Sequence, residues 1–125
     1  MKDKILGSLV GVALGDALGM PTEFMTQEAI REVYGMVREL RAPHPQHYHS
    51  THLVKGQITD DTEQTLALLD AFFRHGRLDA EVAAESLMEW AREKNVFGST
   101  YLGPSSKKAL QRLLDGEDPR QTGVF

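Results

Sequence analysis

The chain has 125 residues, of which 41% are hydrophobic and 26% are charged, proportions typical of a globular protein. Its formal net charge of -4 argues against nucleic-acid binding, because no basic stripe is present to neutralise phosphates. Cysteine is absent, which excludes disulfides and thiolate metal sites and is compatible with a cytoplasmic location. The length fits one modest domain or part of a larger one.

Residues 5–18 form an apolar stretch in which a glycine recurs at every fourth position from Gly7 to Gly19. Apolar residues repeat at three- and four-residue spacing, which predicts a helix buried on nearly all sides. The glycine row predicts close approach of a neighbouring helix. A signal peptide or membrane span fits poorly, because a span needs about 20 residues and this stretch contains Asp16. We therefore expect no membrane association.

Two acidic residues and a proline mark the end of this helix. Asp16 lies among apolar residues, where an unpaired charge is costly, so we expect it to face a polar groove or to accept hydrogen bonds. Pro21 ends the helix. Glu23 follows, and its carboxylate could handle a proton or a ligand hydroxyl, or could simply be the first solvated residue after a buried helix.

A short helix is predicted next, with Thr26 as its N-cap and Gly35 after its C-terminus. Residues 41–58 contain two prolines and show no periodicity, which predicts a long loop. The histidines of this loop are His44, His47, His49 and His52. Their spacing could serve Zn²⁺ or Ni²⁺, although a polar loop without metal is the simpler interpretation.

A strong helix is predicted from Thr59 or Asp61 to the residue before Gly76. Its start places one hydroxyl and two carboxylates on the consecutive residues Thr59, Asp60 and Asp61. Hard cations such as Mg²⁺ prefer such oxygen ligands, and a loop-to-helix junction can spread the side chains around an ion. Ordinary helix capping is the alternative, since Thr and Asp are also preferred N-cap residues.

Two further helices are predicted, one capped by Asp79 and one that starts near Ser105 and ends before Gly116. The glutamates at positions 81, 85, 89 and 93 are expected to face water. In the last three predicted helices, the residues expected to face the core are Leu66, Leu69, Phe73, Ala83, Leu87, Trp90, Leu110, Leu113 and Leu114. No segment has the period of a strand, so the predicted class is all-α.

The start of the last predicted helix is a second candidate for ligand binding. Gly103 and Pro104 are followed by Ser105 and Ser106, so that free backbone N–H groups and two hydroxyls meet at a helix N-terminus. Such a terminus can hold a phosphate. The same residues are also a common way to begin a helix without any ligand.

Three motifs in this order resemble the ADP-ribosylglycohydrolase family, including the dinitrogenase reductase-activating glycohydrolases. The family's G-D-A-x-G-x-x-x-E pattern is matched by Gly15, Asp16, Ala17, Gly19 and Glu23. Its T-D-D-T motif is matched by Thr59, Asp60, Asp61 and Thr62. Its G-x-[ST]-[ST] helix start is matched by Gly103, Ser105 and Ser106.

The resemblance implies a multi-helix orthogonal bundle, of which residues 1–125 would be an incomplete N-terminal portion forming one domain. It implies two Mg²⁺ ions, or Mn²⁺ in some members, that serve hydrolysis at the anomeric carbon of ADP-ribose linked to a protein or a small metabolite. By position, Thr59, Asp60 and Asp61 would be metal ligands, and Glu23 would act with the two aspartates in catalysis and contact the ribose. Gly103, Ser105 and Ser106 would lie near the diphosphate.

Two departures from the family pattern qualify these expectations. Many members have an acid where this chain has Tyr101, which favours another ribosyl compound, such as a nucleoside, over ADP-ribosylarginine. The family's second metal motif, D-x-D-[ST], is absent, so we expect this chain alone to be inactive. The alternative is a non-catalytic member that binds ADP-ribose or serves a structural role, as crystallins of this fold do. The oligomeric state is not predicted.

Overall fold

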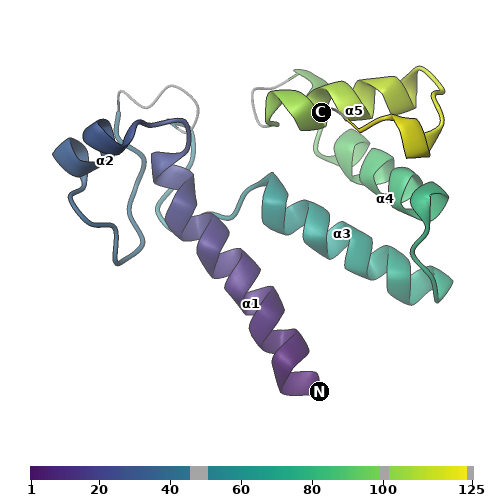
Figure 1. Cartoon of the computed structure of the whole chain (residues 1–125), viewed down its shortest axis with the longest axis horizontal. Coiled ribbons are helices and arrows are strands. Elements are labelled where there is room, and N and C mark those ends of the chain that lie inside the picture. The colour runs from purple at the N-terminus through teal and green to yellow at the C-terminus, as the bar shows by residue number, and fades with distance from the viewer. Residues whose placement is uncertain (46–50, 99–101, 124–125) are drawn as a thin grey trace. The chain divides into compact units, whose positions relative to one another are not determined.

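The computed structural model describes residues 1–45, 51–98 and 102–123 (Figure 1). Within these ranges the chain is helical or irregular and has no strand, which confirms the predicted all-α class. The helices are α1 (Lys2–Gly19), α2 (Gln27–Val33), α3 (Asp60–His75), α4 (Ala80–Glu93) and α5 (Pro104–Leu114). Single 3-10 turns, η1 (Met20–Thr22), η2 (Val96–Gly98) and η3 (Pro119–Gln121), follow α1, α4 and α5.

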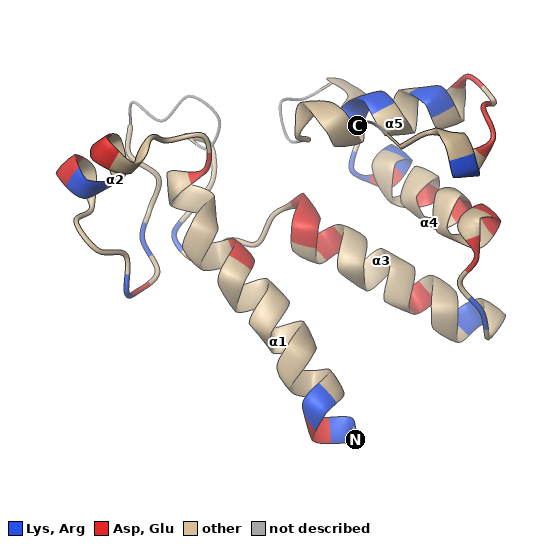
Figure 2. Ribbon diagram, viewed as in Figure 1, with Lys and Arg blue, Asp and Glu red and all other residues tan. Residues whose placement is uncertain are grey.

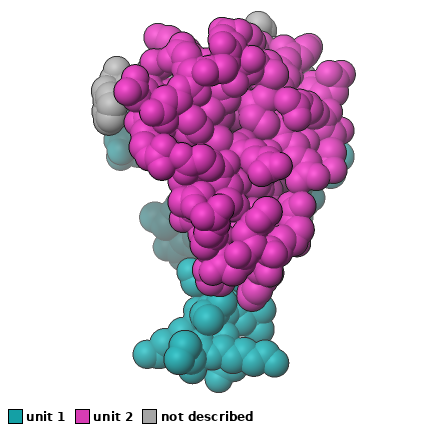
Figure 3. Space-filling model, turned by 90° about the vertical axis from the view of Figure 1, so that its right-hand side faces the viewer, with its two compact units in different colours: residues 1–62 teal, residues 63–125 magenta. Residues whose placement is uncertain are grey.

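The chain divides into two compact units, Met1–Thr62 and Glu63–Phe125, which Figure 3 shows in different colours. The boundary falls in the first turn of α3. Unit 1 therefore contains α1, α2, the loop that follows them and the start of α3, whereas unit 2 contains the rest of α3 with α4 and α5. Each unit is described by itself.

In unit 1, α1 is anchored at its C-terminal end and exposed along the rest of its length. Ala17, Met20 and Pro21 are buried there, and Pro21 lies in the 3-10 turn that ends the helix, as predicted. The expectation of an all-round buried helix is wrong: apolar side chains that keep half or more of their surface exposed are Ile5, Leu6, Val10 and Leu14. The physical reason is that no other described element of unit 1 covers this face.

The glycine row of α1 also differs from its prediction. A Cβ placed on any of the glycines from Gly7 to Gly19 would meet nothing within 4 Å. Within the described part of unit 1, the predicted close approach of a neighbouring helix is therefore absent. Residues Lys2–Thr22 have a mean hydropathy of 1.4 in an 18-residue window, so by length and composition alone they could also cross a membrane. Figure 2 shows how sparsely this helix is charged.

The core lies in unit 2 and is centred on α4. It comprises Met88, Trp90, Ala91, Val96, Leu102 and Leu110. The predicted inward positions of Trp90 and Leu110 are confirmed, and the α4 glutamates are exposed as expected. Leu66 and Phe73 of the predicted stripe on α3 are instead exposed by 46% and 74%, whereas Leu69 is partly buried, and Leu114 on α5 is exposed by 43%.

Local signals in the sequence set the ends of the helices. Thr26 and Asp79 cap α2 and α4, each by accepting the N–H of the third helical residue, at 3.2 Å for Ala29 and 3.0 Å for Val82. Gly76 has a positive φ of 67° directly after α3, a conformation that favours glycine. The predicted boundaries of these helices are confirmed, as is the irregular course of the described part of residues 41–58.

Candidate metal and ligand site

Asp16 joins α1 to the start of α3 through four hydrogen bonds, all within unit 1. Its Oδ2 accepts the backbone N–H groups of Thr59 and Thr62 at 2.8 and 3.2 Å. The Thr59 hydroxyl donates to Oδ1 at 2.6 Å, and the Thr62 hydroxyl donates to Oδ2. The expectation that Asp16 accepts hydrogen bonds is thus confirmed, and both threonine side chains are buried.

These hydrogen bonds determine the charge state of Asp16. Burial by itself would raise the pKa of the Asp16 carboxyl, but the side-chain and backbone donors of Thr59 and Thr62 outweigh it. The pKa of Asp16 therefore lies below its ordinary value of 3.8. A carboxylate that accepts several hydrogen bonds is stabilised in its charged form, so Asp16 is an anion at neutral pH.

A cavity of about 340 Å³ opens beside this junction, entirely within unit 1. Its polar lining comes from Asp16, Glu23, Thr59 and Asp61. The first two follow one another near the end of α1, whereas Thr59 is 43 residues after Asp16 in the sequence. Its remaining lining residues are Val12, Gly15, Gly19 and Met20. The structure therefore brings Glu23 to the same cavity as Thr59 and Asp61.

Asp60, the first residue of α3, is half-buried and has an unusual ionisation. Burial raises its pKa, and repulsion by the Asp61 carboxylate raises it further, while a backbone hydrogen bond opposes this. The charges of Glu23 and Asp16 add to the repulsion, and the resulting pKa is about 6. Burial and the neighbouring carboxylates together therefore make ionisation of Asp60 less favourable than for an ordinary aspartate.

This arrangement fits a divalent cation. The donor set of Thr59, Asp60 and Asp61 consists of hard oxygens, and a cation would offset the burial and the repulsion that raise the pKa of Asp60. The set is partial, however, because no three Asp, Glu or His side chains in the described ranges gather closely enough to hold a metal by themselves. The residues fit part of a magnesium site.

The other predicted site residues lie elsewhere. Gly103, Ser105 and Ser106 belong to unit 2, where Gly103 precedes α5 and the serines lie in its first turn. The predicted helix start is confirmed, and the phosphate role stays a prediction. His47, His49 and Tyr101 lie outside the described residues.

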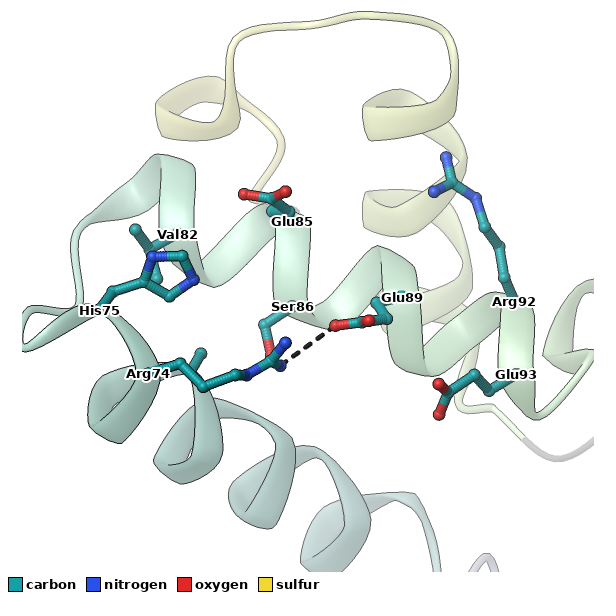
Figure 4. Close-up of a pocket in the computed structure, with 9 residues that line it drawn as sticks. Arg74, His75, Val82, Glu85, Ser86, Glu89, Arg92 and Glu93 are labelled. Carbon is teal, nitrogen blue, oxygen red and sulfur yellow. Dashed lines mark hydrogen bonds and ion pairs between the residues drawn. The ribbon is translucent and has the colours of Figure 1, made fainter.

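Unit 2 has its own cavity, of about 410 Å³, between α3 and α4 (Figure 4). Several of its polar groups have partners on α3 and α4: Arg74 pairs with Asp70 at 2.8 Å and with Glu89 at 3.1 Å, and the Ser86 hydroxyl donates to the Ala67 carbonyl at 2.9 Å. Although this cavity is the larger of the two, none of the predicted site residues lines it. The charge pairs indicate a structural contact between two helices.

Thr62 has a contact with Asp16 that the sequence did not indicate, and it was not among the predicted site residues. Its buried hydroxyl and its N–H both bind Asp16, 46 residues earlier in the chain. The signal was present, because Thr62 is the third residue of α3, where an N–H has no partner within the helix. Local spacing could not reveal a partner on another helix.

Fold and site together define an all-helical protein with an acidic, oxygen-lined site where one helix begins. A model of the ADP-ribosylglycohydrolase family matches residues 1–125, and the chain belongs to that family.

Known relatives share this part of their sequence. An uncharacterized protein of Archaeoglobus fulgidus is 40% identical over 125 residues, all of this chain and 38% of that protein. The ADP-ribosyl-[dinitrogen reductase] glycohydrolase of Rhodospirillum rubrum is 38% identical over 112 residues, 90% of this chain and 35% of that enzyme. The ADP-ribosylarginine hydrolase Tri1 of Serratia proteamaculans is 32% identical over 115 residues, 90% of this chain and 29% of that enzyme. The chain thus spans about a third of the length of these relatives.

Proposed function

We propose that this chain carries one half of the cation and substrate site of a Mg²⁺-dependent ADP-ribosylglycohydrolase. Membership of the family supports the reaction class. The single observation that carries the site is the cavity beside the start of α3, which brings the carboxylates of Asp16, Glu23 and Asp61 together with the hydroxyl of Thr59. Such an excess of negative charge is suited to a divalent cation.

The residues that would hold the cation are Thr59, Asp60 and Asp61, through one hydroxyl and two carboxylates. Mg²⁺, or Mn²⁺ in its place, would supply a polarised water and neutralise charge that develops on oxygen. Asp60 and Asp61 must both be ionised to act as ligands, so cation binding should weaken as the pH falls through about 6, where Asp60 takes up a proton. A complete dinuclear site would need further ligands beyond these three.

Glu23 would act on the substrate, because it lines the same cavity as Thr59 and Asp61. Its carboxylate would accept a hydrogen bond from a ribose hydroxyl and orient the sugar. In the reaction, the bond between the anomeric carbon and the acceptor atom breaks, and a water oxygen bonds to that carbon. The two protons of the water end on the new hydroxyl and on the departing acceptor.

The start of α5 would serve the diphosphate. Gly103, Ser105 and Ser106 offer backbone N–H groups and hydroxyls at the positive end of an 11-residue helix, a common way of binding phosphate oxygens. This role comes from the family resemblance, and neutralising the diphosphate would add to the affinity for ADP-ribose.

The substrate would be an ADP-ribosylated protein or a small ribosyl metabolite, and the protein would work in the cytoplasm. Two relatives bear names that specify dinitrogen reductase and arginine as acceptors, while Tyr101 keeps a nucleoside or another ribosyl compound open. Because Thr59, Asp60 and Asp61 supply only part of a metal site, we expect this chain to bind ligand weakly and to turn over little by itself.

Calorimetric titration of ADP-ribose into the chain, with and without Mg²⁺, tests the proposal. We expect saturable binding that requires Mg²⁺ and is lost in Glu23→Ala, with Glu28→Ala on the exposed side of α2 as the matched control. ADP-ribose binding of equal affinity with and without Mg²⁺ would favour the alternative of a non-catalytic member that binds ADP-ribose. The absence of binding at any Mg²⁺ concentration would refute the proposal.

A further inference from the structure

The start of α3 differs from the starts of the other capped helices. In α2 and α4 the residue before the helix uses its own side-chain oxygen to accept the N–H of the third helical residue, Thr26 from Ala29 and Asp79 from Val82. This is the usual N-cap arrangement. In α3 the corresponding N–H, that of Thr62, donates to Asp16 of α1 instead of to Thr59.

The consequence for Thr59 follows from the chemistry of a hydroxyl, which has one proton and two lone pairs. The proton of Thr59 is donated to Asp16 Oδ1 at 2.6 Å, and the N–H that an N-cap threonine normally serves is taken by Asp16 Oδ2. Asp16 therefore does the capping and also accepts the hydroxyl proton. A hydroxyl that binds a cation must direct its proton away from the ion.

We propose that Asp16 is a positioning residue that holds the Thr59 hydroxyl in the orientation required to bind a divalent cation. It would act through Thr59 and would not bind the cation itself. This inference rests on the cation site proposed above. It goes beyond that site by assigning the acid of α1 a function other than joining two helices.

The alternative is that Asp16 serves the site only by its negative charge or only by holding α3 in place. A double-mutant cycle separates these roles. We would measure the dissociation constant of Mn²⁺ by electron paramagnetic resonance for the unaltered chain, Asp16→Asn, Thr59→Val and the double variant. Thermal unfolding of each metal-free protein would be followed in parallel.

Asparagine keeps the shape of Asp16 but offers one acceptor oxygen in place of two. We expect Asp16→Asn to weaken Mn²⁺ binding by about 10- to 100-fold, the usual range for groups that orient metal ligands. In the Thr59→Val background, Asp16→Asn should not weaken Mn²⁺ binding any further, because the hydroxyl through which Asp16 acts is already absent. An equal loss in both backgrounds would show that Asp16 acts by charge and would overturn the inference.

Two single variants provide the controls and do not depend on the folding of Asp16→Asn. Thr62→Val removes a hydroxyl that binds Asp16 but leaves Thr59 intact, so it should lower the unfolding temperature and leave Mn²⁺ affinity nearly unchanged. Thr59→Ser keeps a hydroxyl that can donate to Asp16 and should retain affinity. A tenfold or greater loss in Thr62→Val would show that the site depends on helix anchoring alone. Failure of the unaltered chain to bind Mn²⁺ would instead refute the proposed site itself.

Discussion

Replacement of Asp60 by asparagine should stabilise the metal-free protein, because it removes a carboxylate that is hard to ionise in the fold. The difference between the ordinary pKa of 3.8 and the folded pKa of about 6 corresponds to about 3 kcal/mol for an unscreened charge. Asp60 is only half-buried, so water screens much of this, and we expect a gain of about 1 kcal/mol in the free energy of unfolding.

The gain should depend on pH with a definite sign. An acid whose pKa is raised by folding contributes stability that is complete below its unfolded pKa of 3.8 and is lost as the pH rises through about 6. The advantage of Asp60→Asn should therefore be absent near pH 4, grow through about pH 6 and be complete near pH 8.

Urea unfolding in the presence of a chelator measures this effect, followed by helical circular dichroism at several pH values. Asp115→Asn, at the exposed residue that directly follows α5, is the matched control and should change stability by less than about 0.5 kcal/mol. A variant Asp60→Asn that is less stable than the unaltered protein near neutral pH would refute the reasoning. So would a gain that does not vary with pH.

Three further predictions concern the cavity, a helix cap and the core. Gly7→Ala and Gly15→Ala should each raise the free energy of unfolding by up to about 1 kcal/mol, because alanine favours the helix and each added Cβ meets open space. Only Gly15→Ala should weaken ADP-ribose binding measured by calorimetry, since Gly15 lines the cavity. Equal affinities would contradict this. Asp79→Ala should lower the unfolding temperature at neutral pH, because the Asp79 carboxylate accepts the Val82 N–H and this bond lowers its pKa. The difference between the two proteins should shrink once the pH falls below 3.8 and vanish below the folded pKa of Asp79. A difference that stays constant across a pH series would refute this. In urea unfolding, Leu110→Ala should cost about 2–5 kcal/mol and Phe73→Ala under about 1 kcal/mol, and a reversed order would contradict the assigned core.

The helix ends could be predicted from the sequence because their causes are local. Pro21 cannot continue a helix, Gly76 takes a positive φ, and Thr26 and Asp79 accept the N–H three residues later. In each case the physical determinant lies within one turn of the residue that marks it. No information about distant parts of the chain was needed.

Burial could not be predicted in the same way. The apolar pattern of α1 identifies Val10 and Leu14 as apolar positions, but periodicity does not say which element covers them, and both are exposed by half or more of their surface. The same holds for Phe73 on α3, which is 74% exposed. The sequence of a helix determines where its hydrophobic face lies, but the burial of that face depends on which other element packs against it.

The candidate site lies between these two cases. The residue types of Thr59, Asp60 and Asp61 indicated an oxygen-lined cation site. Asp16, an acid within an apolar helix, indicated that hydrogen-bond donors must lie nearby. That these two features meet, through a bond of 2.6 Å between residues 43 positions apart, required the structure. Neither capping nor cation binding alone explains why the α3 cap is supplied by another helix.

The most direct test of the account is calorimetric titration of Mg²⁺ into the unaltered chain and into Asp61→Asn. Asp61 lines the cavity and is a proposed ligand, so its substitution should abolish a saturable heat of binding that the unaltered chain shows. The same heat in both proteins, or none in the unaltered chain, would contradict the claim that the start of α3 binds the cation.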